Sequence, residues 1–335
     1  MQIINVKGKE AMKRVLMAKG ARILVEQCAS VKAGETVLVV TDYLKVGIAE
    51  MIASAARELD AEVIVTVISP TPIDGAEPPR AVAEAMKAVD CVIMPVSKSL
   101  AHTDATRLAI QEAGARVISM TAFIEDQLMG GGLFADFRKE KPVCDHMAQL
   151  LGEAKTVHVT TRAGMDLRFS VDGRPGNSHC CIVESAGFSA VPNIEANISP
   201  VEGTTQGVIV GDGSIPYYDI GVIEEPVLFK VKEGFIHEIT GGQQARFIRR
   251  LLAAQNDKFV YNIAQFAVGL NPMCRALTGV MLNDEGVLGT IHIGIGTSSN
   301  LGGSTKAATH FDVIIQNPTV ALDEKTVIED GELKI

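Results

Sequence analysis

The first 125 residues alternate short β-branched runs with segments of helical periodicity, and this pattern limits the fold more than any other feature of the chain. The runs are almost continuous in Val and Ile, as in strands that are covered on both faces. We expect strands at 35–41, 61–68, 91–96 and 116–120. Helices are expected at 10–32, 44–59, 78–88 and 104–113. Strands that alternate with helices predict an α/β fold with a doubly wound parallel sheet.

The character of the chain changes between about residues 125 and 155. After a helix expected at 137–154, most segments are strand-like, with a hairpin predicted at Glu233-Gly234. A chain of 335 residues is long for a single core. We therefore predict two domains, 1–135 and 136–335, the second a β-rich α+β domain. The turn at 41–44 has no Gly-x-Gly-x-x-Gly, so the first domain is expected to be Rossmann-like without the dinucleotide fingerprint.

Composition argues against several classes of partner. The net charge is −9 and aromatic residues make up 4% of the chain, which disfavours binding to nucleic acid. No apolar run reaches the roughly 18 residues that a membrane span needs, and no signal peptide is evident. We therefore expect a cytoplasmic protein that contacts neither nucleic acid nor membrane.

Two polar side chains near the C-terminus are the surest candidates for metal ligands. His310 and Asp312 are two residues apart, so in a strand both point to the face opposite Phe311. An imidazole and a carboxylate often bind a divalent ion together. Spacing alone favours a structural hydrogen bond between them. His292, which lies in an apolar strand bracketed by glycines, shifts the interpretation towards a metal site.

Four other residues are weaker candidates. Glu202 could be a ligand on a loop or a solvated acid. In Asp284-Glu285 one of the two acids, Glu285 being the candidate we name, could act as a general base or hold a ligand in place, and both could equally be solvent-facing turn residues. Gln265 is a poor metal ligand, but its amide can orient water or substrate. His102 follows the third strand, at the end where such sheets bind ligands, although helix capping also explains its segment.

Several segments together resemble a known family. They are 262–272 (NIAQFAVGLNP), 284–296 (DEGVLGTIHIGIG), Gly302-Gly303 and 310–319 (HFDVIIQNPT), with 201–203 (VEG) and 101–103 (AHT) upstream. Their order and spacing resemble the aminopeptidase T-type, leucyl-aminopeptidase-like metallopeptidases. That family also includes 2,5-dihydroxypyridine 5,6-dioxygenase. The resemblance extends from about residue 10 to residue 330.

The resemblance implies a set of metal ligands. The family's peptidases hold two divalent ions with Glu, Glu, His, His and Asp, and four of these match Glu202, His292, His310 and Asp312. The second Glu falls at Gln265, where an amide removes a charge and a bridging ligand. This departure weakens the case for hydrolysis with two metals.

Two further comparisons concern the reaction. The catalytic Tyr of the peptidases has no counterpart in 297–299 (TSS). The dioxygenase branch binds one Fe(II) through His, His and Asp. His102 matches a histidine of that branch, whereas its first ligand histidine again falls at Gln265.

Three hypotheses follow for the function. The favoured one is an aminopeptidase-like hydrolase, in which Zn, Mn or Co activates water against a small peptide or amide, with Glu285, Gln265 and His102 as catalytic candidates. The alternative is a mononuclear Fe(II) ring-cleaving dioxygenase. The third is a non-catalytic relative that binds a metal or ligand. All three imply a small-molecule or short-peptide ligand, and the resemblance implies a homodimer.

Overall fold

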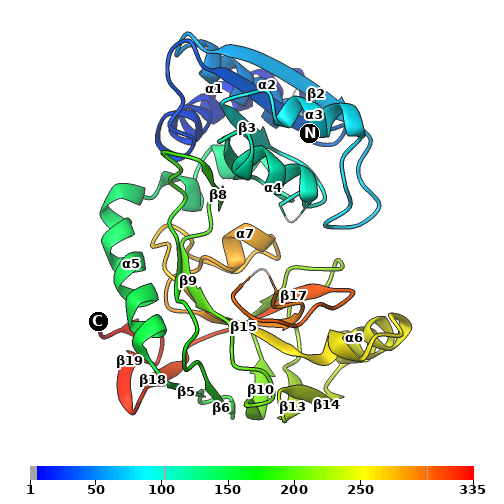
Figure 1. The fold of residues 1–335 in the computed structure, drawn as a ribbon, viewed down its shortest axis with the longest axis vertical. Coiled ribbons are helices and arrows are strands. Elements are labelled where there is room, and N and C mark those ends of the chain that lie inside the picture. The colour runs from blue at the N-terminus through cyan, green and yellow to red at the C-terminus, as the bar shows by residue number, and fades with distance from the viewer. Residues whose placement is uncertain (1–5, 102, 300) are drawn as a thin grey trace, which may run out of the picture. The chain divides into compact units, whose positions relative to one another are not determined.

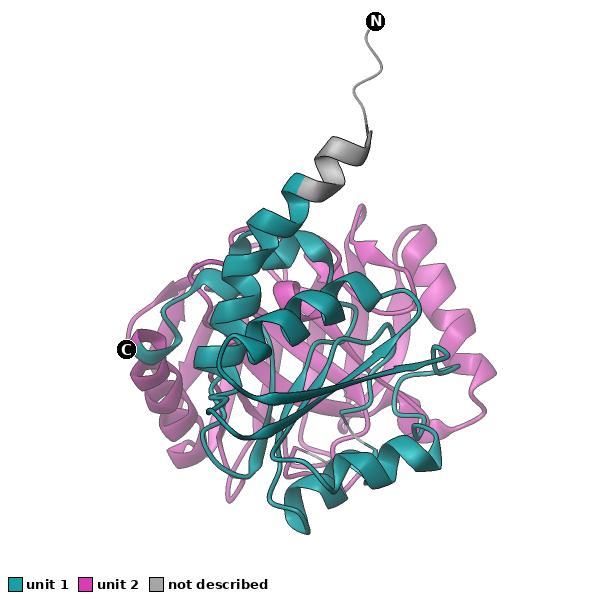
Figure 2. Cartoon of the chain, turned by 90° about the horizontal axis from the view of Figure 1, so that it is seen from above, with its two compact units in different colours: residues 1–138, 181–192 teal, residues 139–180, 193–335 magenta. Residues whose placement is uncertain are grey.

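The computed structural model describes the backbone of residues 6–335 except 102 and 300, and the side chains from residue 12 onward with the same exceptions. The chain forms two compact units (Figure 2). Unit 1 comprises 1–138 and 181–192, and unit 2 comprises 139–180 and 193–335.

Unit 1 contains the parallel sheet that the sequence predicts, here called sheet A (Figure 1). Its order is β2 (Glu62–Ile68), β1 (Thr36–Asp42), β3 (Cys91–Met94), β4 (Arg116–Ser119) and β8 (Gly187–Ala190). The four predicted strands are confirmed within a few residues. The fifth strand, β8, was not predicted, because the sequence Gly-Phe-Ser-Ala has no β-branched residue.

Helices cover sheet A on both faces. They are α1 (Val6–Ile23) with the π-helical turn Leu24–Cys28, α2 (Val46–Arg57), α3 (Arg80–Met86) and α4 (Asp104–Gln111), and 3₁₀ turns follow at Glu125–Leu128 and Gly131–Phe134. One face of β1, with Leu38 and Val40, packs in a core that includes Val82 of α3 and Ala109 of α4. The alternate residues of β1 face the opposite layer, to which α2 belongs.

Unit 2 is built from two antiparallel sheets. Sheet B has the order β14 (Phe235–Thr240), β13 (Val227–Lys232), β10 (Gln206–Gly211), β6 (Asp166–Ser170), β5 (Thr156–Thr160), β18 (Thr319–Leu322), β19 (Lys325–Glu329), β20 (Glu332–Leu333). Sheet C has the order β12 (Gly221–Val222), β11 (Ser214–Ile215), β17 (His310–Ile315), β16 (Ile291–Gly296), β15 (Ile263–Gly269), β9 (Glu195–Ile198), β7 (Asn177–His179). The predicted β-rich character is confirmed.

Few helices follow residue 136. They are α5 (Phe137–Glu153), α6 (Gln243–Ala254), the single-turn α7 (Met281–Asp284) and the 3₁₀ turn Lys258–Tyr261. The predicted hairpin joins β13 to β14, and both Glu233 (φ 52°) and Gly234 (φ 78°) have the positive φ that a tight hairpin turn requires. Among the described residues, every helix is too short or too polar to cross a bilayer.

Candidate metal centre

The three central strands of sheet C, β15, β16 and β17, present an apolar face and a polar face, and both are buried. Phe266, Ile293 and Phe311 lie on the apolar face, where the Phe266 ring lies 5.5 Å from that of Phe169 in sheet B. Because strand side chains alternate, the residues next to them in each strand point the other way. The polar face therefore carries a row of residues in which Gln265 is paired with Gly294, and Gly294 with Asp312.

A glycine in this row leaves room for the polar side chains. A Cβ atom at Gly294 would lie 2.6 Å from Cβ of Gln265 and 3.0 Å from both Asp312 Oδ1 and His310 Cε1. These distances are shorter than ordinary contacts, so any larger residue would push the three side chains away. The glycine noted in the sequence therefore has a steric reason.

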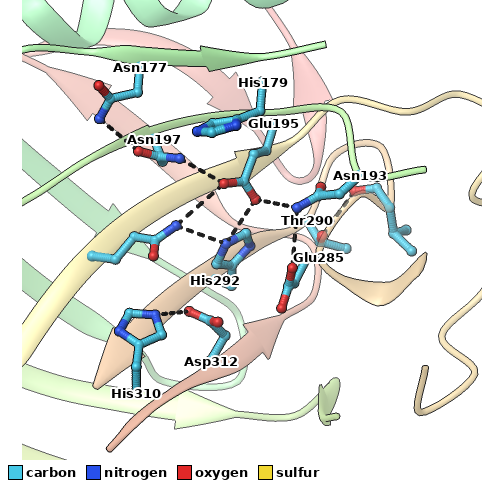
Figure 3. Close-up of polar contacts among 12 residues, drawn as sticks. Asn177, His179, Asn193, Glu195, Asn197, Glu285, Thr290, His292, His310 and Asp312 are labelled. Carbon is cyan, nitrogen blue, oxygen red and sulfur yellow. Dashed lines mark hydrogen bonds and ion pairs between the residues drawn. The ribbon is translucent and has the colours of Figure 1, made fainter. Parts of the chain in front are cut away.

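His310 and Asp312 converge as their spacing predicts (Figure 3). The Nδ1 atom of His310 donates a hydrogen bond of 2.8 Å to the carbonyl oxygen of Thr297. This bond leaves Nε2 facing Asp312 Oδ1 at 3.6 Å. An imidazole whose Nδ1–H is bound to a carbonyl is oriented, with its Nε2 lone pair available, as in most metal-binding histidines.

His292 forms a second pair, with a carboxylate that the sequence analysis did not single out. Its Nε2 lies 3.2 Å from Oε2 of Glu195, on β9, and both side chains are almost fully buried. Asn193 and Asn197 each donate a hydrogen bond of 2.7 Å to the Glu195 carboxylate. Gln265 lies beside the pair, with Nε2 3.5 Å from Glu195 Oε1 and 3.4 Å from His292 Nε2.

Glu285 and Tyr217 connect the two pairs. The hydroxyl of Tyr217 lies 2.8 Å from Asp312 Oδ2 and 3.0 Å from Glu285 Oε1. Asn193 Nδ2, which binds Glu195, also lies 3.2 Å from Glu285 Oε2. A polar chain thus runs from Glu195 through Asn193, Glu285 and Tyr217 to Asp312.

The charges of the two pairs determine the pKa values of their carboxyl groups. Burial by itself would raise the pKa of Glu195, but the charge and hydrogen bond of His292 outweigh it and hold that pKa at about 2. Burial by itself would also raise the pKa of Asp312, but the charge and hydrogen bond of His310 outweigh it and hold that pKa at about 2. Both carboxylates are therefore ionised at neutral pH.

The partners shift in the complementary direction. Burial lowers the pKa of His292, but Glu195 more than compensates and raises it. Burial likewise lowers the pKa of His310, but Asp312 more than compensates and raises it. Burial, then the charges of Asp312 and Glu195, raise the pKa of Glu285 well above its usual value.

This donor set fits a divalent cation. Two neutral imidazoles and two carboxylates carry a charge of about −2, which one divalent ion neutralises without extra protons on the histidines. Two buried polar atoms, His292 Nδ1 and Asp312 Oδ1, have no hydrogen-bond partner among the described residues. As the side chains of the described residues stand, no three His, Cys, Asp or Glu groups surround a single point closely enough to hold an ion.

The structure brings together five of the residues predicted from the sequence. His292, Gln265, Glu285, His310 and Asp312 all lie in the network described above. Of the remaining two, His102 lies outside the described residues, and Glu202 is a separate case. Glu195 and Tyr217 were missed. Glu195 could have been noticed, because Glu195-Ala196-Asn197 places two polar side chains on one face of an otherwise apolar strand.

Glu202 does not join the network. Its Oε1 accepts hydrogen bonds from the backbone N–H (2.6 Å) and the hydroxyl (2.8 Å) of Ser304, and Oε2 is paired with Arg174. Its side chain is 31% exposed. Both of its oxygens are thus engaged by Ser304 and Arg174, and the carboxylate found beside His292 is Glu195.

Comparisons with known proteins agree with one branch of the resemblance. A model of the 2,5-dihydroxypyridine 5,6-dioxygenase family matches residues 21–335. The curated 2,5-dihydroxypyridine 5,6-dioxygenase of Pseudomonas putida KT2440 is 25% identical over 196 residues, which are 55% of this chain and 55% of that protein. The chain thus aligns with about half the length of this curated relative.

Two solved structures share the fold. The 2,5-dihydroxypyridine dioxygenase from Pseudomonas putida KT2440 superposes with a TM-score of 0.81 at 19% identity, covering 96% of this chain and 97% of that one. Wild-type AmpT from Thermus thermophilus gives 0.72 at 13% identity, covering 96% and 99%. At such identities the likeness concerns the fold, a mixed α/β architecture with one parallel and two antiparallel sheets.

The family match corrects the functional expectation. The favoured interpretation was an aminopeptidase-like metallopeptidase, a hydrolase. It is wrong, because both the matching family model and the curated relative are dioxygenases. The substitution at Gln265 and the missing tyrosine at 297–299 had already weakened that interpretation. With the model matching nearly the whole chain, this protein belongs to the 2,5-dihydroxypyridine 5,6-dioxygenase family.

Proposed function

We propose that this protein is a metal-dependent dioxygenase that opens the ring of a small hydroxylated pyridine, with Fe(II) as its metal. The family match over residues 21–335 carries the proposal. The buried polar face of sheet C supports it, because histidine and carboxylate ligands are those of mononuclear iron oxygenases. The substrate class follows the name of the curated relative.

In this proposal His310 and Asp312 bind the metal, and His292 supplies the second imidazole. Support comes from the orientation of His310 by Thr297 and from the unpartnered Asp312 Oδ1. Glu195 then holds His292 in place and balances its charge. When bound, Fe(II) would supply the electrons that activate dioxygen and a position at which the substrate is held next to it.

The other candidates act around the metal. Glu285 lies 3.0 Å from the Tyr217 hydroxyl, and its carboxyl group can receive or release a proton as substrate hydroxyl groups ionise. Gln265 offers an amide beside His292 and Glu195, which can bind a substrate oxygen or nitrogen. The predictions of a homodimer and of a domain division near residue 135 remain proposals beside this function.

The test is a reaction with a full oxygen balance. Protein purified without oxygen is loaded with Fe(II) and given 2,5-dihydroxypyridine and ¹⁸O₂. We expect one O₂ consumed per ring opened, with both labelled atoms in the ring-opened product. Asp312→Ala, loaded in the same way, serves as the inactive control.

Two results would count against the proposal. One is an Fe(II)-loaded protein that consumes no O₂ with any member of a panel of dihydroxypyridines and related hydroxylated rings. The other is ring opening at the same rate in Asp312→Ala, which would remove the metal site from the reaction.

A further inference from the structure

Two consecutive tyrosines hold the strand that carries His310 and Asp312. They follow β11, whose Ser214 is paired with Ile314 of β17. The ring of Tyr218 packs edge-on against Phe311 at 6.2 Å between centroids. Tyr217 instead directs its hydroxyl to Asp312 Oδ2 at 2.8 Å. Neither tyrosine is among the residues predicted from the sequence, and neither is a ligand in the proposed function.

The two oxygens of Asp312 therefore have different surroundings. Oδ2 is occupied by the hydrogen bond from Tyr217. Oδ1 has no hydrogen-bond partner among the described residues and lies 3.6 Å from His310 Nε2. Gly294 keeps the space next to Oδ1 clear, since a Cβ there would approach it to 3.0 Å. Oδ1 is thus the oxygen of Asp312 that no hydrogen bond from the described residues occupies.

Glu285 is a second carboxyl neighbour of the Tyr217 hydroxyl. A phenol has one proton, and here it has two carboxyl neighbours, at 2.8 and 3.0 Å. The contact with Asp312 is the shorter of the two, so Asp312 is the better placed acceptor for the phenol proton. Asn193 Nδ2 lies 3.2 Å from the other oxygen of Glu285 and holds that carboxyl group in place.

We propose that Tyr217 is a positioning residue that makes Asp312 a one-oxygen ligand, binding the metal through Oδ1 alone. This inference rests on the proposed function, because it requires a metal at His310 and Asp312. A carboxylate that uses one oxygen leaves an additional coordination position for substrate or dioxygen, whereas a chelating carboxylate would fill it.

The experiment uses Co(II), whose visible absorption weakens as its coordination number rises. Wild-type protein and Tyr217→Phe, both full-length and freed of metal, are titrated with Co(II) in the presence of a competing chelator. We expect Tyr217→Phe to release Oδ2, lower the visible absorption per bound ion, and weaken Co(II) binding by about 10- to 100-fold. A purely structural loss would change the amount of folded protein and leave the spectrum per bound ion unchanged.

A matched variant separates Tyr217 from its surroundings. Glu285→Gln keeps a group of the same shape, whose amide can donate to Tyr217 while its oxygen still accepts from Asn193. We expect Glu285→Gln to keep the wild-type Co(II) spectrum. The inference is overturned if Tyr217→Phe binds Co(II) with the wild-type spectrum and affinity.

A measurement on the wild type covers the case in which Tyr217→Phe does not fold. A crystal structure of the Co(II)-loaded protein should show Oδ1 of Asp312 on the metal and Oδ2 on Tyr217, and two bound oxygens would overturn the inference. Failure of the proposed function has a different signature. Wild-type protein that binds no Co(II) removes the metal site altogether, and the positioning role with it.

Discussion

The central strand β3 of sheet A and the centre of sheet C are both buried, but for different physical reasons. In β3 of sheet A all four buried side chains, Cys91 to Met94, are apolar, and burial supplies stability through the hydrophobic effect. In β15, β16 and β17 one face is equally apolar, whereas the other buries Gln265, His292 and Asp312. Burying those groups costs free energy that their mutual contacts must offset. Burial alone therefore does not distinguish a core from a site.

The largest effect on metal affinity is expected from replacing a proposed ligand on the polar face of sheet C. We expect His310→Ala to weaken Co(II) or Fe(II) binding by more than the roughly 100-fold that loss of an outer hydrogen-bond partner can cause. The reason is that Nε2 of His310 is the nitrogen oriented towards Asp312. Chelator competition measures the affinity.

Glu202→Gln is the matched control for that measurement. Glu202 is held by Ser304 and Arg174, away from the network, so its loss should leave the metal affinity unchanged. A large loss in Glu202→Gln together with none in His310→Ala would restore the original ligand set.

Truncating an apolar side chain should show the opposite behaviour in sheet A. Ile93 of β3 is fully buried, so Ile93→Ala should lower the free energy of unfolding by about 2–5 kcal/mol. The loss should be the same with and without metal, because sheet A holds none of the proposed ligands. Urea unfolding in chelator and in Co(II) measures both values. A loss that depends on metal would mean that the two sheets are not independent.

The two histidines predict how metal binding depends on pH. In the metal-free protein burial lowers the pKa values of both histidines, but Glu195 and Asp312 raise them by more. Both histidines therefore keep a proton above pH 6.5. A metal must displace these protons. Apparent affinity should therefore rise as pH rises through the raised values, by about tenfold per pH unit for each proton displaced. Titrations with Co(II) between pH 6 and 9 measure the slope, and a flat profile would contradict the assignment.

Metal-free stability supplies the control for the same groups. The raised histidine pKa values stabilise the fold below pH 6.5, and this contribution is lost as pH rises through them. The lowered pKa of Glu195, about 2, stabilises the fold above pH 4.5 and is lost as pH falls towards 2. The pair should thus contribute most between pH 4.5 and 6.5. Bound metal should remove the loss on the alkaline side.

The contrast between the sheets also explains what the sequence could predict. Uninterrupted Val and Ile runs identified β1 to β4, because strands buried on both faces need them. His310 and Asp312 are two residues apart in β17, so their shared face could also be predicted from the local sequence. β8 has no such run, so its sequence did not predict a strand. Its pairing with β4 at the edge of sheet A makes it one.

The missed residues depend on contacts between distant segments. Glu195 lies 97 positions from His292 in sequence, and only the order of strands in sheet C brings them together. Glu202 stands in a motif that matches the family, yet its neighbours Ser304 and Arg174 determine where its carboxylate points. Spacing within one strand is a local property, whereas the identity of the second carboxylate is decided by topology.

The smallest expected change in the free energy of unfolding concerns the exposed edge strand of sheet A. Val65 of the edge strand β2 is 45% exposed, and its register partner Val39 on β1 is fully buried. Val65→Thr should change the free energy of unfolding by no more than about 0.5 kcal/mol, because the new hydroxyl remains in water and the β-branched shape is kept. Val39→Thr makes the same chemical change one strand inward, and burying that hydroxyl should cost about 1–3 kcal/mol. Urea unfolding of both variants measures the difference. Equal losses would show that Val65 is covered in solution by something that the single chain lacks, and the edge of sheet A would then count as buried like its centre.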